Sequence, residues 1–328
     1  MTARRAGRTG WREWIATSAA AVFSLALAGG CVTEEHQEEM RIRLDIDEGS
    51  IKVSVLGTAG LGGPERAVDA LGLPRLPAAL AVRSIQEGTL YLIDLSPSSL
   101  VQLESILDPG DPGLARIGPP VDHLFLTHLN PEVIPALTRL LFNTLPGQVL
   151  EVTATRSMLE AITSDPDLVR TGRIEQLHVN EAVDGEPLEL GKTLRITPFH
   201  SPIDNERAFL GYRIEGSQRA LVYLPACGSL ESVRAAVIEQ RYGPVRILLA
   251  DGTRFDDREA PPAGFPPGCH PPMTEVLRLV DPGKPGGVHV LFTNLPARSP
   301  ALDPNGRYQR LLLQAGARLE SDGSEYWL

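Results

Sequence analysis

The amino-acid sequence predicts an α/β fold that is rich in loops. Short apolar and β-branched stretches of strand length alternate with runs whose apolar residues recur at helical spacing. The 28 Pro and 31 Gly are spread over many short turns, and aromatic residues make up only 5% of the chain. With 328 residues, the chain has ample material for a core, as one large domain or as two ordinary ones.

The strands are expected where apolar residues alternate with polar ones or run on without a break. In chain order these stretches are 51–56, 79–82, 89–93, 121–126, 146–153, 173–179, 194–200, 211–215, 220–223, 247–251 and 288–293, with a closing hairpin of 318–320 and 325–328. Helices are expected at 98–107 and 156–163 and in the apolar-periodic runs that end at residues 141, 280 and 314.

The first thirty residues differ in kind from the rest. Four arginines precede an apolar run that ends in small residues, the pattern of an export signal. Ala28-Gly29-Gly30-Cys31 resembles a bacterial lipobox, in which Cys31 would be lipidated and become the mature N-terminus. We therefore expect a signal peptide at 1–30, a polar tether at 31–49, and a folded domain at 50–328 anchored to a cell-envelope membrane and facing the periplasm or the exterior. An uncleaved membrane anchor is the alternative.

The chain is acidic. Its formal net charge is −10, and it becomes −13 when residues 1–30 are removed. This charge disfavours nucleic acid as a partner. Apart from Cys31, only Cys227 and Cys269 remain; whether they pair is left open.

The stretch around residues 121–135 carries the clearest chemical signal. A buried strand is expected up to Leu126, and Thr127 to Glu132 would lie at its carboxyl end, where open α/β sheets usually bind ligands. His128, Asn130 and Glu132 are the candidate functional residues there. A purely structural interpretation is also open, with Asn130 capping the following helix and Glu132 complementing the helix dipole.

The phrase Thr127-His128-Leu129-Asn130-Pro131-Glu132-Val133 resembles the Thr-His-x-His-x-Asp-His signature of the metallo-β-lactamase superfamily. Asn130 occupies the place of the second His, and Val133 that of the last His. The resemblance implies a metallo-β-lactamase-like αββα four-layer sandwich. It also implies a metal site, although two of the three imidazoles are missing.

A narrower resemblance is to the coenzyme PQQ (pyrroloquinoline quinone) synthesis protein B family. The phrases that carry it are 55–60, 90–97, 221–228, 247–253 and the closing segment after 288. That family is associated with PQQ biosynthesis, through movement of the quinone or its precursor to the periplasm or oxidation of the precursor at a metal. The cysteine-rich segment of the family, between the first two phrases, is missing here.

Other candidates also lie at predicted strand ends. The strand 247–251 ends in Asp251, which relatives would use as a metal ligand, and His270 aligns with the His of a Gly-His-x-Pro phrase of the family. The remaining candidates are His200 as a metal ligand and Arg254, Thr293 and Asn294, with Asn130, as substrate-binding residues. Each of these residues also has an ordinary structural interpretation, such as an Asx turn at Asp251.

Three functions remain in competition. His128 and His270 with Asp251 or Glu132 form a two-His, one-carboxylate set suited to a single Fe or Zn ion, with His200 as a further ligand and Asp251 or Glu132 as the catalytic group. Such a site would serve a mononuclear oxidase or hydroxylase acting in PQQ biosynthesis, or a zinc-dependent hydrolase. The third function is a non-catalytic lipoprotein that uses a degenerate site to hold a small acidic or aromatic ligand.

Overall fold

The computed structural model describes residues 51–60, 75–106, 121–144, 147–202, 208–225, 229–259, 269–284 and 287–328. All of them belong to the unit Glu48–Leu328. The predicted signal peptide, the tether and Cys31 lie outside the described residues. No helix in the described part of the chain is long and apolar enough to cross a membrane.

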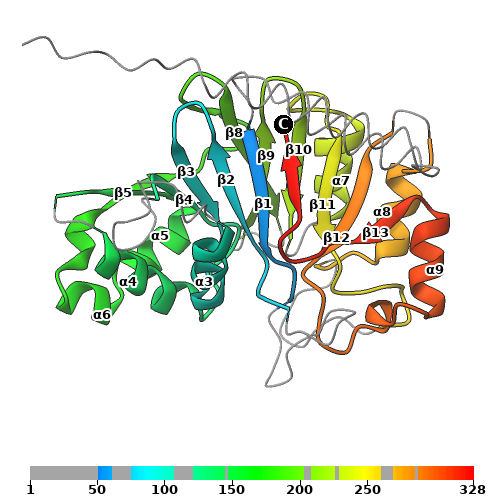
Figure 1. The fold of residues 1–328 in the computed structure, drawn as a ribbon, viewed down its shortest axis with the longest axis horizontal. Helices are drawn as coiled ribbons and strands as arrows, with labels where there is room; N and C mark the ends of the chain where they lie inside the picture. Colours follow the sequence, from blue (N-terminus) through cyan, green and yellow to red (C-terminus); the bar gives the residue numbers. More distant parts are fainter. Residues whose placement is uncertain are drawn as a thin grey trace, which may run out of the picture. The chain divides into compact units, whose positions relative to one another are not determined.

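One of the two sheets is built mainly from the first half of the domain (Figure 1). Its order is β14-β1-β2-β3-β4-β5-β6, and the pairs from β3 to β6 are parallel. The strands are β1 (Ile51–Gly57), β2 (Ala79–Ser84), β3 (Thr89–Ile93), β4 (His123–Phe125), β5 (Leu150–Ala154), β6 (Leu177–Glu181) and β14 (Glu325–Trp327).

The other sheet has the order β13-β12-β11-β10-β9-β8-β7, and the pairs from β10 to β13 are parallel. Its strands are β7 (Leu188–Leu190), β8 (Leu194–Pro202), β9 (Ala208–Glu215), β10 (Ala220–Leu224), β11 (Ile247–Asp251), β12 (His289–Thr293) and β13 (Ala317–Leu319).

Three separate apolar cores define the layers. One core lies between the sheets, because its buried side chains come from β1 to β4 on one side and from β8 to β12 on the other. A second joins the outer face of the first sheet to the helices α3 (Pro97–Ile106), α4 (Val133–Asn143), α5 (Arg156–Thr163) and α6 (Pro166–Arg170). A third joins the second sheet to α7 (Leu230–Val233), the π-helix η2 (Arg234–Ile238), α8 (Met273–Val280) and α9 (Arg307–Gln314). The predicted αββα sandwich is therefore confirmed.

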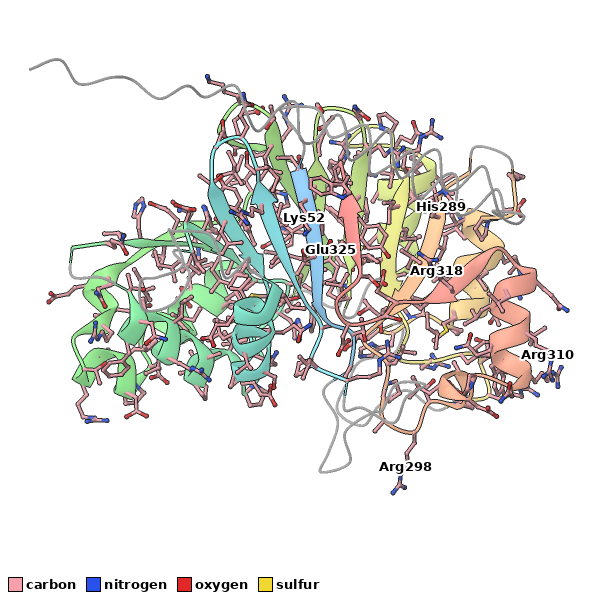
Figure 2. All side chains as sticks on the ribbon, in the orientation of Figure 1. Lys52, His289, Arg298, Arg310, Arg318 and Glu325 are labelled. Atoms are coloured by element: carbon pink, nitrogen blue, oxygen red, sulfur yellow. The ribbon has the colours of Figure 1, made fainter. Side chains whose placement is uncertain are left out.

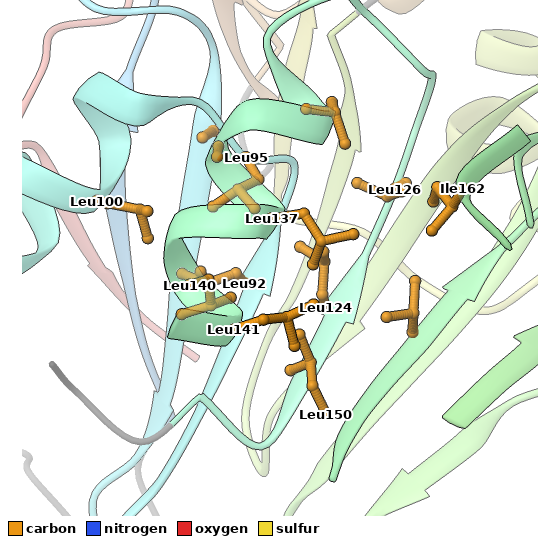
Figure 3. Packing of buried hydrophobic residues seen from close by; sticks show 14 of the residues in the cluster. Leu92, Leu95, Leu100, Leu124, Leu126, Leu137, Leu140, Leu141, Leu150 and Ile162 are labelled. Atoms are coloured by element: carbon orange, nitrogen blue, oxygen red, sulfur yellow. The ribbon is translucent and has the colours of Figure 1, made fainter. Parts of the chain in front are cut away.

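The packing of α4 shows how the sequence pattern produces this arrangement. Its residues Val133, Ala136, Leu137, Leu140 and Leu141 recur at helical spacing and are all buried. Figure 3 shows the helix lying over leucines of the first sheet, in a cluster that includes Leu92, Leu124, Leu126 and Leu150. The run of apolar residues after the β4 strand is thus explained by burial against the sheet.

Some predicted elements were wrong. The closing hairpin does not form: β13 pairs with β12 in one sheet, whereas β14 pairs with β1 in the other. A salt bridge of 2.6 Å between Lys52 and Glu325 accompanies the β1–β14 pairing (Figure 2). The predicted strand 173–179 begins as a 3-10 helix, η1 (Arg173–Gln176), before β6. The sequence analysis also missed α6, β7, α7, η2 and the 3-10 helix η3 (Pro300–Leu302).

Candidate functional site

The candidate site lies where the carboxyl ends of several strands meet. Since β10, β11 and β12 are parallel neighbours, their carboxyl ends lie at the same edge of the second sheet. The segment after β4 reaches this edge from the first sheet. There the Leu210 backbone N–H donates to the Thr127 carbonyl at 2.9 Å, and the Tyr212 hydroxyl donates to the Leu126 carbonyl at 2.9 Å. Both partners belong to β9, whose pairing places Tyr212 beside Tyr223 of β10.

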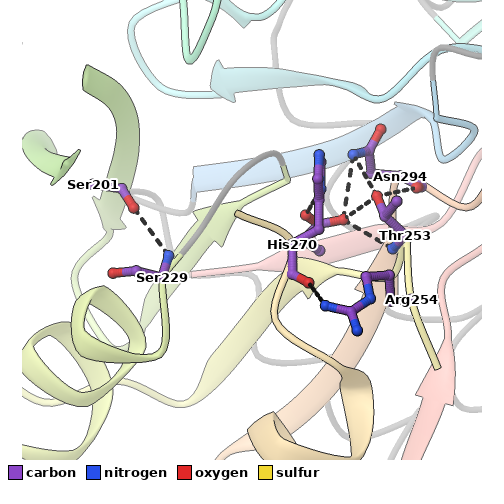
Figure 4. Close-up of polar contacts among 7 residues, drawn as sticks. Ser201, Ser229, Thr253, Arg254, His270 and Asn294 are labelled. Carbon is purple, nitrogen blue, oxygen red and sulfur yellow. Dashed lines mark hydrogen bonds and ion pairs between the residues drawn. The ribbon is translucent and has the colours of Figure 1, made fainter. Parts of the chain in front are cut away.

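Asp251 is the centre of the first polar cluster, of which Figure 4 labels Thr253, His270 and Asn294. One of its carboxylate oxygens accepts from the Thr253 backbone N–H at 2.9 Å, the Thr253 hydroxyl at 2.6 Å and the Asn294 amide at 3.3 Å. The other pairs with Nδ1 of His270. Asp251 and His270 are only 3% and 4% exposed. Because an ionised carboxylate only accepts hydrogen bonds, this pairing makes Nδ1 the protonated nitrogen of His270.

A second polar cluster surrounds Asp94, the residue that follows β3. Its Oδ1 accepts from the Thr127 backbone N–H at 2.8 Å, and its Oδ2 accepts from the Thr127 hydroxyl at 2.6 Å. The same hydroxyl lies 2.7 Å from Nδ1 of His128. The half-buried His128 ring also stacks on Phe209, with ring centroids 5.8 Å apart. Asp94, Thr127 and His128 thus form one connected chain.

Burial dominates the electrostatics of this second cluster. It raises the pKa of the Asp94 carboxyl, although the charge of His128 and the two Thr127 donors lower it in part. Tyr223 projects from β10 towards the same group, and burial together with the Asp94 charge raises the pKa of its phenol well above 10.0. Its hydroxyl approaches Asp94 and in turn lowers the pKa of that carboxyl in part.

Backbone strain is concentrated at this edge. Asp94, His270 and Asn294 have φ values of 62°, 59° and 58°, in the left-handed region that non-glycine residues rarely adopt. Each such residue costs on the order of 1–3 kcal/mol, a cost that the surrounding contacts must offset. Strain of this kind is typical of functional sites, which supports the choice of this edge as the candidate site.

The residues at the start of α4 have structural contacts. The side-chain oxygen of Asn130 accepts from the Glu132 backbone N–H at 2.8 Å, and the Asn130 carbonyl accepts from Val133 N–H at 3.1 Å. Asn130 is buried and Glu132 is half-buried. Asn130 thus forms an Asx turn just before α4, while Glu132 occupies the N-cap position and α4 has no side-chain cap, so the predicted capping role of Asn130 was wrong and its predicted substrate-binding role is untested.

The other candidates make contacts of different kinds. The Arg254 guanidinium stabilises the loop that follows β11, because it donates to the backbone carbonyls of Glu259 at 2.9 Å and His270 at 3.4 Å. Thr293 is paired with Asp251 across β11 and β12, and its buried hydroxyl has no partner among the described residues. His200 is exposed at the end of β8, and its backbone N–H donates to Asp184 at 2.7 Å.

Cys269 directly precedes His270 and is disulfide-bonded. The side chain is only 2% exposed. Both other cysteines of the chain, Cys31 and Cys227, lie outside the described residues.

Comparison with known proteins decides the family. The model of the beta-lactamase superfamily domain matches residues 89–289, more than half of the chain. The chain belongs to the beta-lactamase superfamily. No curated protein matches it.

Solved structures of superfamily folds agree with this assignment. Zinc-bound PqqB from Methylobacterium extorquens is similar over 84% of this chain and 100% of its own, with 18% identity and a TM-score of 0.63. A diphosphatase from the PhnP family matches with 19% identity over 84% of this chain and 97% of its own, with a TM-score of 0.57. The metallo-beta-lactamase fold protein YhfI from Bacillus subtilis matches with 16% identity over 85% and 100%, with a TM-score of 0.56. At these low sequence identities, the similarity to the solved structures shows a shared fold alone.

The superfamily fold implies a metal, but the described residues do not fit a site with several ligands. They contain no group of three or more His, Cys, Asp or Glu side chains that could hold a metal ion. Asp251 and His270 come together, as the sequence analysis predicted, whereas Nδ1 of His128 contacts Thr127 in the other cluster. The predicted set of two His and one carboxylate is therefore not gathered as a group in this part of the chain.

Two residues of the candidate site, Asp94 and Tyr223, were not predicted from the sequence. Asp94 and Tyr223 were noted only as parts of strand phrases, although Asp94 follows the predicted strand 89–93 just as Asp251 ends the strand 247–251. The same rule about carboxyl strand ends would have found Asp94. Nothing in the sequence around Tyr223 indicates that its hydroxyl would approach Asp94, because that contact joins the two sheets.

Proposed function

We propose that this chain is a divergent relative of the coenzyme PQQ synthesis protein B family that binds PQQ or its precursor at the strand-end site. In this role it takes part in PQQ biosynthesis by holding or moving the molecule. One observation carries the proposal: the best-formed polar cluster, Asp251 with His270 and Asn294, is paired internally and has no third metal-ligand side chain among the described residues.

Two further observations favour binding over catalysis. Asn130 and Val133 occupy the places of two imidazoles of the superfamily signature. The Asn130 side chain forms a turn before α4, and Val133 is fully buried in the core. A dinuclear hydrolase needs several closely placed ligands. The polar groups at the edge, with the unpartnered Thr293 hydroxyl, are instead of the kind that orients a small polar ligand.

The second candidate function is a mononuclear metal-dependent oxidase or hydrolase. The buried Asp251–His270 pair favours it. A carboxylate that accepts a hydrogen bond from Nδ1 of a histidine commonly orients the ring so that Nε2 can bind a metal or act as a base. The similarity to the PhnP-family diphosphatase is consistent with the hydrolase form. In this alternative a single Fe or Zn ion would supply the reactive chemistry.

We also propose that the protein is a lipoprotein of the cell envelope, anchored through Cys31 and facing the periplasm or the exterior. The arginines and the apolar run before the small residues Ala28-Gly29-Gly30 support this location. Growth with an alkyne-bearing fatty acid should label the wild-type chain and not the Cys31→Ser variant. Equal labelling of both would contradict the anchor.

Calorimetric titration of the purified full chain with PQQ tests the proposed function. We expect saturable binding that persists after treatment with a chelator and weakens about tenfold in His270→Asn, since loss of one charge-assisted contact corresponds to roughly 1.4 kcal/mol. Asparagine tolerates the left-handed backbone of position 270. His289→Gln, an exposed position at the opposite end of β12, is the matched control and should bind normally.

Two results would overturn the proposal. One is the absence of PQQ binding by the folded wild-type chain. The other is a metal-dependent hydrolysis of phosphate esters that His270→Asn abolishes and His289→Gln preserves, which would establish the second candidate function instead.

A further inference from the structure

The segment that contains α9 differs in charge from the chain as a whole. The formal net charge of the chain is −10. Between Val288 and Leu319 there are four arginines and one acidic residue, Asp303, so the formal charge of this segment is 4 − 1 = +3. The four are Arg298, Arg307, Arg310 and Arg318. Figure 2 labels three of them in the half of the molecule that carries α8 and α9. A local excess of positive charge on an acidic protein indicates a partner of negative charge.

The helical spacing of α9 places two of these arginines on its outer face. Leu312 is fully buried beneath the helix, in the core against the second sheet, whereas Arg307 and Arg310 are exposed. At 3.6 residues per turn, Arg310 and Arg307 lie roughly 160° and 140° around the helix from Leu312. Both side chains therefore project away from the protein.

The guanidinium groups of Arg307 and Arg310 are available to an external anion. Neither forms a salt bridge with a carboxylate in the part of the chain that the structure describes, and Arg310 donates one N–H to the Asn305 carbonyl at 2.5 Å. Exposed arginines elsewhere are neutralised, as in the Arg156–Glu181 salt bridge of 2.7 Å. A guanidinium has five N–H donors, so most of those of Arg310 remain to bind another group.

Two exposed leucines accompany these charges. Leu313 is 64% exposed, the highest value among the large apolar side chains of the described residues, and Leu311 is 37% exposed. They lie about 100° to either side of Leu312 and therefore flank the two arginines. Exposed leucines beside basic residues on one helix are typical of surfaces that lie in a membrane interface.

We propose that the α9 surface, made of Arg307, Arg310, Leu311 and Leu313, docks on a bilayer that contains anionic phospholipids. The guanidinium groups donate to the headgroup phosphates, an acceptor that suits their planar geometry. The two leucines enter the boundary between headgroups and acyl chains. Since α9 buries its opposite face in the protein, the contact is shallow and the helix axis lies along the membrane surface.

Docking of the α9 surface complements the proposed lipid anchor, and this step rests on that proposal. A tether as long as residues 31–49 can extend by about 60 Å, so lipidation of Cys31 alone leaves the orientation of the domain free. The rest of the acidic chain is repelled by anionic lipid, whereas the α9 surface is attracted. The anchored domain therefore has one favoured orientation on the membrane.

Hydrogen exchange with mass spectrometry on the full chain tests the docking. The chain is reconstituted in vesicles of phosphatidylcholine, with or without added phosphatidylglycerol. We expect slower exchange of residues 307–314 only where phosphatidylglycerol is present, and loss of this protection in about 0.5 M sodium chloride, where charges are screened beyond about 4 Å. The helix α5, in the other helical layer, should exchange equally in both kinds of vesicle.

Matched variants separate charge from structure. A basic residue at an anionic surface strengthens binding roughly fivefold, so Arg307→Gln combined with Arg310→Gln should weaken docking roughly 25-fold. Arg307→Lys combined with Arg310→Lys keeps the charge and should retain most of the protection. Arg170→Gln, at an exposed position of α6, is the control and should dock like the wild type.

Three results would overturn the proposal. The first is equal exchange of residues 307–314 in the two kinds of vesicle, and the second is protection that survives loss of both arginines in the glutamine variant. The third is protection of α9 without vesicles together with a dimer mass by light scattering, which would make a second copy of the chain the partner. Because the two vesicles differ only in lipid charge, failure of docking leaves the fatty-acid labelling of Cys31 and the binding of PQQ as separate questions.

Discussion

At the scale of single residues, Asp251 receives more of the site's contacts than any of the other candidates named from the sequence. Two donors of Thr253, the amide of Asn294 and the ring of His270 all meet its buried carboxylate. The carboxylate forms an Asx turn and also positions the histidine. The Asx turn that the sequence left open is therefore confirmed, and the metal-ligand role of Asp251 stays a prediction.

We predict that Asp251→Ala destabilises the domain by about 3–5 kcal/mol, because it leaves several buried donors without an acceptor. Asp251→Asn should cost less, since its side-chain oxygen can still accept from Thr253. Urea denaturation followed by circular dichroism measures both changes. Asp257→Ala, at an exposed position of the following loop, is the control and should stay within about 0.5 kcal/mol of the wild type. A loss of similar size in the control would contradict this account.

His123 gives a prediction about pH. Its ring is stacked on Phe125, and Nε2 lies 2.7 Å from the Thr153 hydroxyl. Burial lowers its pKa from 6.5 to about 4. The unfolded chain therefore binds more protons than the folded one between these values, so the contribution of His123 is fully present above pH 6.5 and is lost as the pH falls towards 4.

The expected loss is about 3 kcal/mol over that range, at 1.36 kcal/mol for each unit of pKa shift. Denaturation midpoints measured from pH 7 to pH 4 should show this slope in the wild type and not in His123→Gln. His289→Gln removes an exposed histidine and should keep the slope. An identical slope in His123→Gln would mean that other groups cause it.

At the scale of elements, the segment 269–273 is held from both sides. The Cys269 disulfide fixes its start, while Met273 N–H donates to the Arg254 carbonyl at 3.0 Å at the start of α8. His270 lies between these two attachments, with a strained backbone and its ring on Asp251. The disulfide therefore contributes to the position of a candidate site residue.

We predict that reduction with dithiothreitol increases hydrogen exchange in residues 269–273 and lowers the stability of the domain by about 2–4 kcal/mol. The strands β2 and β3 of the other sheet should keep their protection. Hydrogen exchange with mass spectrometry measures both regions, and Cys269→Ser should respond no further to the reductant. An equal rise in exchange throughout both sheets would contradict a local role.

Element prediction succeeded where burial creates a pattern and failed where pairing is long-range. The leucines of α4 and the apolar strand 247–251 reveal their structure because their spacing reflects the face that they bury. The residues 317–319 and 325–327 look like a hairpin because a short turn separates them. Yet β13 and β14 go to different sheets, because β13 pairs with β12, whereas β14 pairs with β1 of the other sheet, which is far from it in the sequence.

At the scale of the whole molecule, the order of apolar strands and helices predicted an α/β fold, the resemblance to the metallo-β-lactamase superfamily predicted the αββα sandwich, and the family match confirms it. The site was predicted only in part. The rule that functional residues gather at the carboxyl ends of strands correctly predicted that Asp251 and His270 lie together. It could not predict that His128 lies near Asp94 instead. That difference depends on a hydroxyl contact of Thr127, which no spacing along the chain encodes.

The central claim is that this superfamily member binds its ligand without a metal site of several side chains. Elemental mass spectrometry of the purified full chain, beside His128→Gln and His270→Asn, tests it most directly. The account predicts iron and zinc contents far below one equivalent in the wild type, unchanged in both variants. Close to one equivalent of either metal in the wild type, lost in both folded variants, would contradict it.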